Sequence, residues 1–251
     1  DLSQAGDQGY FSDGMSEEIL NALVKVEGLQ VASRTSSFGF KGQEALGVPA
    51  IAGKLEVRHI LEGSVRRAGD TLRITAQLID AETDRHLWSE TFDRPLTAEN
   101  VFAIQDDIAR AIVAALVDSL DLKDVGSVAP AKPTANLTAY DLYLQARAMF
   151  QARRDFAEAD RLLAEALDQD PAFAKAWELR AAVMMMMDEY GGSELDAAEI
   201  YRIAIGYAEK ALAIDPRSAL ALASIANMSG LVSRNLGQPA DRAKIIADLE
   251  R

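Results

Sequence analysis

The stretch from Gly47 to Lys54 has the residue types of a phosphate-binding loop, in which glycine amides and a lysine hold a nucleotide. Its spacing does not fit, because five residues rather than four separate Gly47 from Gly53. Leu55 also stands where such a loop needs a magnesium-binding serine or threonine. Pro49 instead suits the first turn of a helix. The stretch therefore predicts the start of a helix and no nucleotide site.

Two further groups of residues have the types of metal ligands. Asp80, Glu82 and Asp84 alternate like the first ligands of a calcium loop, but Arg85 and Thr91 stand where an EF-hand requires glycine and glutamate. We expect a solvated hairpin turn there. The chain has two histidines and no cysteine, so a zinc site would need both histidines together with carboxylates. We expect no metal site.

Catalytic chemistry is also not indicated. Serine and aspartate are plentiful enough for a Ser-His-Asp arrangement, but no nucleophile-elbow sequence supports one. We therefore assign no catalytic, cofactor-binding or metal-binding residues, and we expect no cofactor.

A short polar segment offers the best candidate for a small-ligand site. Leu29–Ser33 is predicted to be a strand, and in α/β proteins ligands bind just past the carboxyl ends of strands. The candidate ligand-loop residues are Arg34, Ser36, Ser37 and Phe38. The alternative is an ordinary loop between a strand and a helix, which is the more common use of such a segment.

Charge and composition restrict the partners. The 251 residues include 39 acidic and 26 basic side chains, for a net charge of −13. That balance argues against nucleic acid or an anionic membrane, because both need a positive footprint. No apolar run approaches the roughly 18 residues of a membrane span. We therefore expect a protein or peptide partner, no nucleic acid, and no direct membrane insertion.

The elements of the first half predict an α/β or α+β domain with a small mixed sheet over residues 1–121. Asp13 is a candidate cap for a first helix, and Pro49 begins another. Alternating apolar residues then predict three consecutive strands. The strands and the following helix are expected at His59–Ala68, Leu72–Asp80, Leu87–Phe92 and Ala98–Leu120.

The second half has the spacing of tetratricopeptide-like helical hairpins. Small residues recur where two helices would cross closely, large apolar residues where a seam would form, and proline after the second helix. These positions are Tyr143, Ala146, Phe150, Ala159, Ala166 and Pro171 in one repeat, and Trp177, Ala181, Ala204, Ala211 and Pro216 in a second. We expect Tyr143, Phe150, Leu163 and Trp177 to be buried in one seam. Residues 138–251 form this helical-repeat domain, and residues 122–137 a linker.

Stacked helical hairpins leave a groove that binds partners. Counting from the signature positions gives the groove-facing candidates Leu144, Ala148, Glu178, Ala182, Met185, Ala223 and Asn227. A peptide-carboxylate clamp would need lysine and asparagine at these positions, and only Asn227 fits. We therefore expect an apolar to acidic groove. In the run Met184–Met187, Met185 or Met186 is a candidate contact because methionine is enriched at interfaces.

Several motifs of the first half resemble one known module. They are residues 11–19 (FSDGMSEEI), 33–38 (SRTSSF), 61–67 (LEGSVRR), 74–80 (ITAQLID), 86–90 (HLWSE) and 102–108 (FAIQDDI). The chain resembles the TolB amino-terminal-like domain followed by tetratricopeptide repeats. This arrangement is found in the carboxy-terminal region of bacterial class III adenylate/guanylate cyclases and of winged-helix regulators. The resemblance covers nearly the whole chain.

The resemblance implies a non-catalytic regulatory or protein-interaction region of a bacterial signalling protein. The competing interpretation is a small-ligand sensor that closes on a metabolite and relays the change to an output domain. The resemblance also implies an apolar strand before Asp1, without which Leu29–Ser33 would be an open sheet edge. We expect that this edge either mediates self-association or is covered by another segment of the chain. The compartment is left open between the cytoplasm and the periplasmic side of a membrane-anchored parent.

Overall fold

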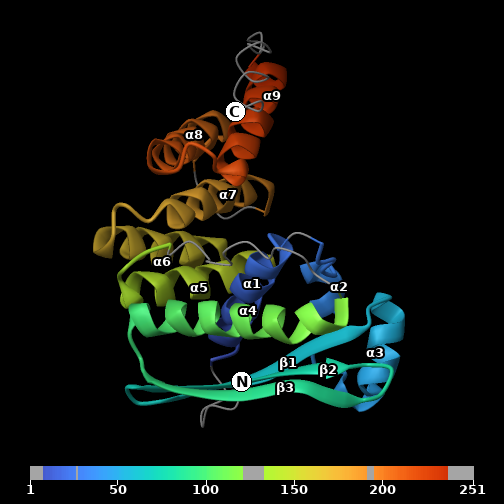
Figure 1. Cartoon of the computed structure of the whole chain (residues 1–251). Coiled ribbons are helices and arrows are strands. Elements are labelled where there is room, and N and C mark those ends of the chain that lie inside the picture. The colour runs from blue at the N-terminus through green and yellow to red at the C-terminus, as the bar shows by residue number, and fades with distance from the viewer. Residues whose placement is uncertain (1–7, 27, 121–132, 191–194, 237–251) are drawn as a thin grey trace. The chain divides into compact units, whose positions relative to one another are not determined.

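The computed structural model describes residues 8–26, 28–120, 133–190 and 195–236. The chain forms two compact units, Asp1–Lys132 and Pro133–Arg251. In the described residues the first unit holds a small sheet with helices and the second holds helices only (Figure 1). The expected fold class, a sheet-containing domain followed by a helical domain, is confirmed.

The sheet consists of β1 (His59–Ala68), β2 (Thr71–Asp80) and β3 (Arg85–Pro95), in the order β1-β2-β3. Both strand pairs are antiparallel, so the described sheet is not the mixed sheet that we expected. Along β2 the buried residues alternate with more exposed ones, which leaves one face apolar. The buried positions of that face are Leu72, Ile74, Ala76 and Leu78.

Helices complete the first unit. They are α1 (Gly9–Val24), the short α2 (Arg34–Phe38), α3 (Val48–Leu55) and α4 (Ala98–Leu120), with a single turn of 3-10 helix at Glu44–Leu46. The long helix α4 runs along the sheet (Figure 1). Its apolar stripe supplies Val101, Ile104, Ile108 and Ile112 to the core. The buried Gln105 amide donates a hydrogen bond to the Met15 Sδ of α1 at 3.1 Å, which joins the two helices.

Two expectations for this unit are wrong. Helix α1 already begins at Gly9, and its N-cap is Gln8, so Asp13 lies inside the helix and does not cap it. Leu29–Ser33 lies outside regular secondary structure and pairs with no strand among the described residues. The described sheet therefore has no edge at Leu29–Ser33. Apolar residues alone do not make a strand here, since a strand also needs a neighbour for its backbone groups.

The second unit contains α5 (Leu137–Gln151), α6 (Phe156–Gln169), α7 (Ala174–Tyr190), α8 (Ala197–Ile214) and α9 (Ala219–Leu236). Each of these helices packs on the next in chain order. Alanines occupy the close crossings, as their spacing predicted, and all are fully buried: Ala146, Ala159, Ala166, Ala181, Ala204 and Ala211. Small side chains here allow the helix axes to approach closely.

Two large residues of the expected seam are less buried than predicted. Tyr143 and Leu163 lie in the core, but Phe150 and Trp177 are only half-buried. The Trp177 ring rests on Tyr207, with 5.5 Å between ring centroids, and its indole N–H donates to the Pro171 carbonyl oxygen at 3.0 Å. Helix α5 begins at Leu137, the last residue of the predicted linker, and residues 122–132 of that linker lie outside the described residues.

Candidate functional site

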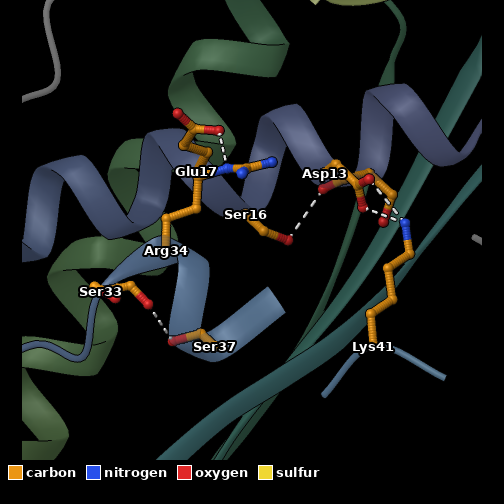
Figure 2. Close-up of polar contacts among 8 residues, drawn as sticks. Asp13, Ser16, Glu17, Ser33, Arg34, Ser37 and Lys41 are labelled. Carbon is orange, nitrogen blue, oxygen red and sulfur yellow. Dashed lines mark hydrogen bonds and ion pairs between the residues drawn. The ribbon is translucent and has the colours of Figure 1, made fainter. Parts of the chain in front are cut away.

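The candidate ligand loop folds into helix α2 (Figure 2). Ser33 caps this helix, because its hydroxyl oxygen accepts a hydrogen bond from the Ser36 N–H at 3.2 Å. The Ser36 hydroxyl lies 2.9 Å from the Ser33 hydroxyl, and the Ser37 hydroxyl donates to the Ser33 carbonyl oxygen at 3.1 Å. The serines of the segment therefore satisfy one another and the backbone of the first turn.

Two ion pairs connect this segment to helix α1. The Arg34 Nε lies 2.6 Å from the Glu17 carboxylate, and the Lys41 Nζ lies 2.7 Å from the Asp13 carboxylate (Figure 2). The Arg34 guanidinium also lies 4.3 Å from the centre of the Phe38 ring, within the range of a cation–π contact. Asp13 and Glu17 are four residues apart on α1 and so lie on the same face of the helix.

These contacts give the loop candidates a structural role. Arg34 and Phe38 contact each other, and Ser36 and Ser37 complete the turn, so a ligand would have to displace contacts that are already made. No residue of α2 is buried. Small-molecule sites are concave and mostly apolar, and a short exposed helix does not supply such a wall. The four residues therefore lie together, in an arrangement that favours the ordinary-loop alternative.

The candidate calcium turn is also built from local contacts. The Asp80 Oδ1 accepts hydrogen bonds from the Glu82 and Thr83 N–H groups at 3.1 and 3.0 Å, and these bonds lower the pKa of Asp80. His59 lies 4.0 Å from Asp80, and burial lowers the pKa of His59. Among the described residues, no group of three or more histidine or acidic side chains is placed to hold a metal ion.

The candidate groove-facing residues differ in how far they are buried. Leu144 and Ala182 are buried within the helical unit, at 2% and 7% exposure, so they do not face a partner as expected. Ala148, Glu178 and Met185 are half-buried, and Ala223 and Asn227 on α9 are exposed. Met185 packs against the cluster formed by Met184, Ile200, Tyr201, Ala204 and Met228. The accessible part of the candidate surface therefore lies mainly on α9.

Glu178 has a structural partner that the sequence did not indicate. Burial raises the pKa of Glu178, and a hydrogen bond with Ser218 and the charge of Lys175 only partly oppose that effect. The Ser218 hydroxyl also accepts from the Ala221 N–H at 3.1 Å, in the first turn of α9. Glu178 therefore links the second turn of α7 to the start of α9.

A cluster of aromatic and basic side chains on α7 and α8 was missed by the sequence analysis. The Arg180 guanidinium lies 4.5 Å from the centre of the Tyr207 ring, and the Lys210 Nζ lies 4.2 Å from that of Trp177. Arg180 also forms a two-bond ion pair with Asp160 of α6, at 2.7 and 3.2 Å. Each helix carries an aromatic residue and a basic residue three positions apart, but only the packing of α7 against α8 brings the two pairs together.

The described helices include none that combines the length and the apolar character needed to span a membrane.

A longer bacterial protein aligns with most of this chain. The chain matches no protein-family model. It is 37% identical over 225 residues to a protein of Rhizobium meliloti (strain 1021) named "Putative adenylate cyclase 3". The match covers 85% of this chain and 36% of the relative, so the chain spans about a third of the length of that protein. The chain is therefore related to part of a protein of a signalling type.

Proposed function

We propose that this chain is a non-catalytic regulatory and protein-interaction region of a bacterial signalling protein, with a TolB-like domain followed by tetratricopeptide-type repeats. Its parent would carry an adenylate or guanylate cyclase domain elsewhere. The chain itself would act by contact between proteins through the surface of its helical unit, with the exposed residues of α9 at the centre of that surface.

The observation that carries this proposal is the extent of the match. Most of this chain aligns with only 36% of a protein whose name is that of a cyclase, which leaves most of the relative for other domains. The helical unit supports a role in interaction, because successive helices stack through buried alanines and leave Ala223 and Asn227 exposed. The local contacts of α2 give no support to the small-ligand sensor, so we do not propose that function.

A steric test of the α9 surface uses the parent protein. Ala223→Arg places a long charged side chain on the exposed face of α9, and we expect it to change the rate of cyclic nucleotide formation by the parent severalfold. Ala213→Arg is the matched control, because Ala213 is also exposed and helical but lies on α8. Circular dichroism would verify that both variants fold. Equal rates for both variants and the unmodified parent would contradict the proposed surface.

A further inference from the structure

Four of the seven methionines of this chain form one continuous run, residues 184–187 of helix α7. An α-helix turns by about 100° per residue, so such a run places methionine on every side of the helix. Met184 is buried, whereas Met185, Met186 and Met187 are half-buried. The run therefore combines one methionine of the core with three that solvent reaches in part.

The buried methionine of the run belongs to an apolar cluster that joins three helices of the second unit. Met185 and Met187 pack against this cluster from its margin. Helix geometry explains this placement, because Met185 and Met187 flank Met184 on its two sides. Met186 lies on the far side of α7 from Met184. The buried members of the cluster come from α7, α8 and α9 and are Met184, Ile200, Tyr201, Ala204 and Met228.

Methionine is the only sulfur-containing residue type of this chain, since cysteine is absent. Oxidation of its thioether to a sulfoxide makes the side chain polar and disrupts apolar cores. Hydrogen peroxide transfers one oxygen atom to the sulfur: the O–O bond breaks, an S–O bond forms and the sulfur gives up two electrons. The second peroxide oxygen keeps its hydrogen, takes the proton of the transferred oxygen and leaves as water. A sulfoxide at the margin of the cluster would therefore bring a polar oxygen against apolar side chains.

We propose that Met185 and Met187 are peroxide-sensitive modification sites, and that their oxidation weakens the packing of α7 against α8 and α9. Both side chains are exposed enough for the oxidant to reach them, and both contact the cluster that joins these helices. Met184 and Met228 lie deeper in the cluster and are shielded from the oxidant by burial. Access for the oxidant and contact with the core therefore coincide at Met185 and Met187.

The consequence for signalling rests on the function proposed above, whereas the modification itself is a property of this chain alone. Met228 of the cluster lies on α9, the helix that also carries the exposed Ala223 and Asn227 of the proposed partner surface. Weaker packing of the cluster would let α9 shift relative to α7. Oxidation should therefore weaken contact with a partner that binds through α9.

Peptide mapping by tandem mass spectrometry identifies the modified residues after the whole chain has been treated with hydrogen peroxide. We expect one added oxygen at Met185 and at Met187, and also at the half-buried Met149 and Met186. These should be modified before the buried methionines, which are Met15, Met184 and Met228. Protection of Met185 and Met187, or oxidation of the buried methionines first, would overturn the proposal.

Thermal unfolding followed by circular dichroism, before and after peroxide treatment, measures the effect on packing. Oxidation should lower the unfolding midpoint of the unmodified chain by roughly 4–8 °C, because it brings a polar oxygen against apolar residues. The double variant Met185→Leu/Met187→Leu keeps the apolar volume but has no sulfur to oxidise at these positions. Its midpoint should fall by less than about 2 °C on the same treatment. Circular dichroism before treatment would verify that the variant folds.

Met186→Leu is the matched control, because Met186 is also half-buried but lies on the far side of α7 from the cluster. Its midpoint should fall on oxidation as much as that of the unmodified chain. Methionine sulfoxide reductases, supplied with a thiol reductant, should restore the midpoint of the oxidised chain.

The outcomes separate the modification from the proposed function. A midpoint that oxidation leaves unchanged, or that falls equally in the double variant and in Met186→Leu, would overturn the modification sites whether or not α9 binds a partner. Oxidation that lowers the midpoint as expected but leaves the rate of cyclic nucleotide formation by the parent unchanged would support the modification sites and contradict their link to α9.

Discussion

At the scale of single residues, Gly63 of β1 occupies a position that requires glycine and that the sequence did not single out. The sequence predicted the strand His59–Ala68, but not the need for Gly63 within it. A Cβ at Gly63 would collide with the Thr75 carbonyl oxygen and lie 3.3 Å from the Ala76 Cα. Both atoms belong to the backbone of the central strand, which is paired on both sides and cannot move aside. Such a close approach depends on strand geometry and is not visible in a sequence.

We predict that Gly63→Ala lowers the free energy of unfolding by about 1–3 kcal/mol, the usual cost of forcing an extra group into a packed site. Gly53→Ala in α3 is the control, because nothing lies within 4 Å of a Cβ there. Alanine favours helix over glycine by roughly 0.5–1 kcal/mol, so this control should be neutral or stabilising. Urea unfolding of both variants gives the comparison. Equal stability of the two would contradict the close approach at Gly63.

The stability of the folded chain should depend on pH through Glu178, and the burial of this carboxyl sets the direction of the effect. Burial raises the pKa of Glu178 in the folded state, so the folded chain holds this proton more tightly than the unfolded chain does. The carboxyl therefore contributes its full stability below its unfolded pKa, about 4.3. That contribution is lost as the pH rises through the folded pKa.

Glu178→Gln should accordingly be more stable than the unmodified chain at pH 7, with a difference that shrinks towards pH 4. Glutamine keeps an oxygen that can accept from Ser218. Thermal unfolding across this pH range, with the exposed Glu209→Gln as control, measures the effect. A difference that stays constant with pH would show that the charge of Glu178 is not penalised.

At the scale of elements, the apolar periodicity of the sequence predicted where helices and strands lie better than it predicted which residues they pack against. Helix α4 and strands β1 and β2 match their predicted ranges closely, because an apolar period or turn residues mark each of them. Leu29–Ser33 failed as a strand, and Trp177 failed as a core residue, because burial and pairing depend on neighbours distant in sequence. The same reason explains why the contacts between Arg180, Tyr207 and Asp160 were missed.

The ion pair between Arg180 and Asp160 should hold α6 and α7 together. Their side chains are only 16% and 24% exposed, whereas Arg161 is 58% exposed and pairs with glutamates of its own helix. We predict that Arg180→Ala destabilises the helical unit by about 1–3 kcal/mol, between the values for exposed and buried pairs. Arg161→Ala should cost less than about 1 kcal/mol. Equal effects in chemical denaturation would contradict this ranking.

At the scale of the whole molecule, the chain forms two compact units and carries a net charge of −13. It aligns with about a third of a relative that is named as a putative adenylate cyclase. The fold class followed from the sequence because the two halves have different periodicities. The candidate site followed only in part. Leu144 and Ala182 were predicted to lie on the binding surface but are buried. The serines of α2 form hydrogen bonds within their own segment. The role of this region in protein interaction is therefore a proposal that the exposed residues of α9 can test.

The most direct test of the central claim, that this region is non-catalytic, is an assay of the purified chain with ATP or GTP and Mg²⁺ or Mn²⁺. Cyclic nucleotide and inorganic phosphate would both be measured against a heat-denatured sample of the same preparation. We predict no product above that control at any chain concentration. Product formation that rises in proportion to the chain and persists through repurification would contradict it.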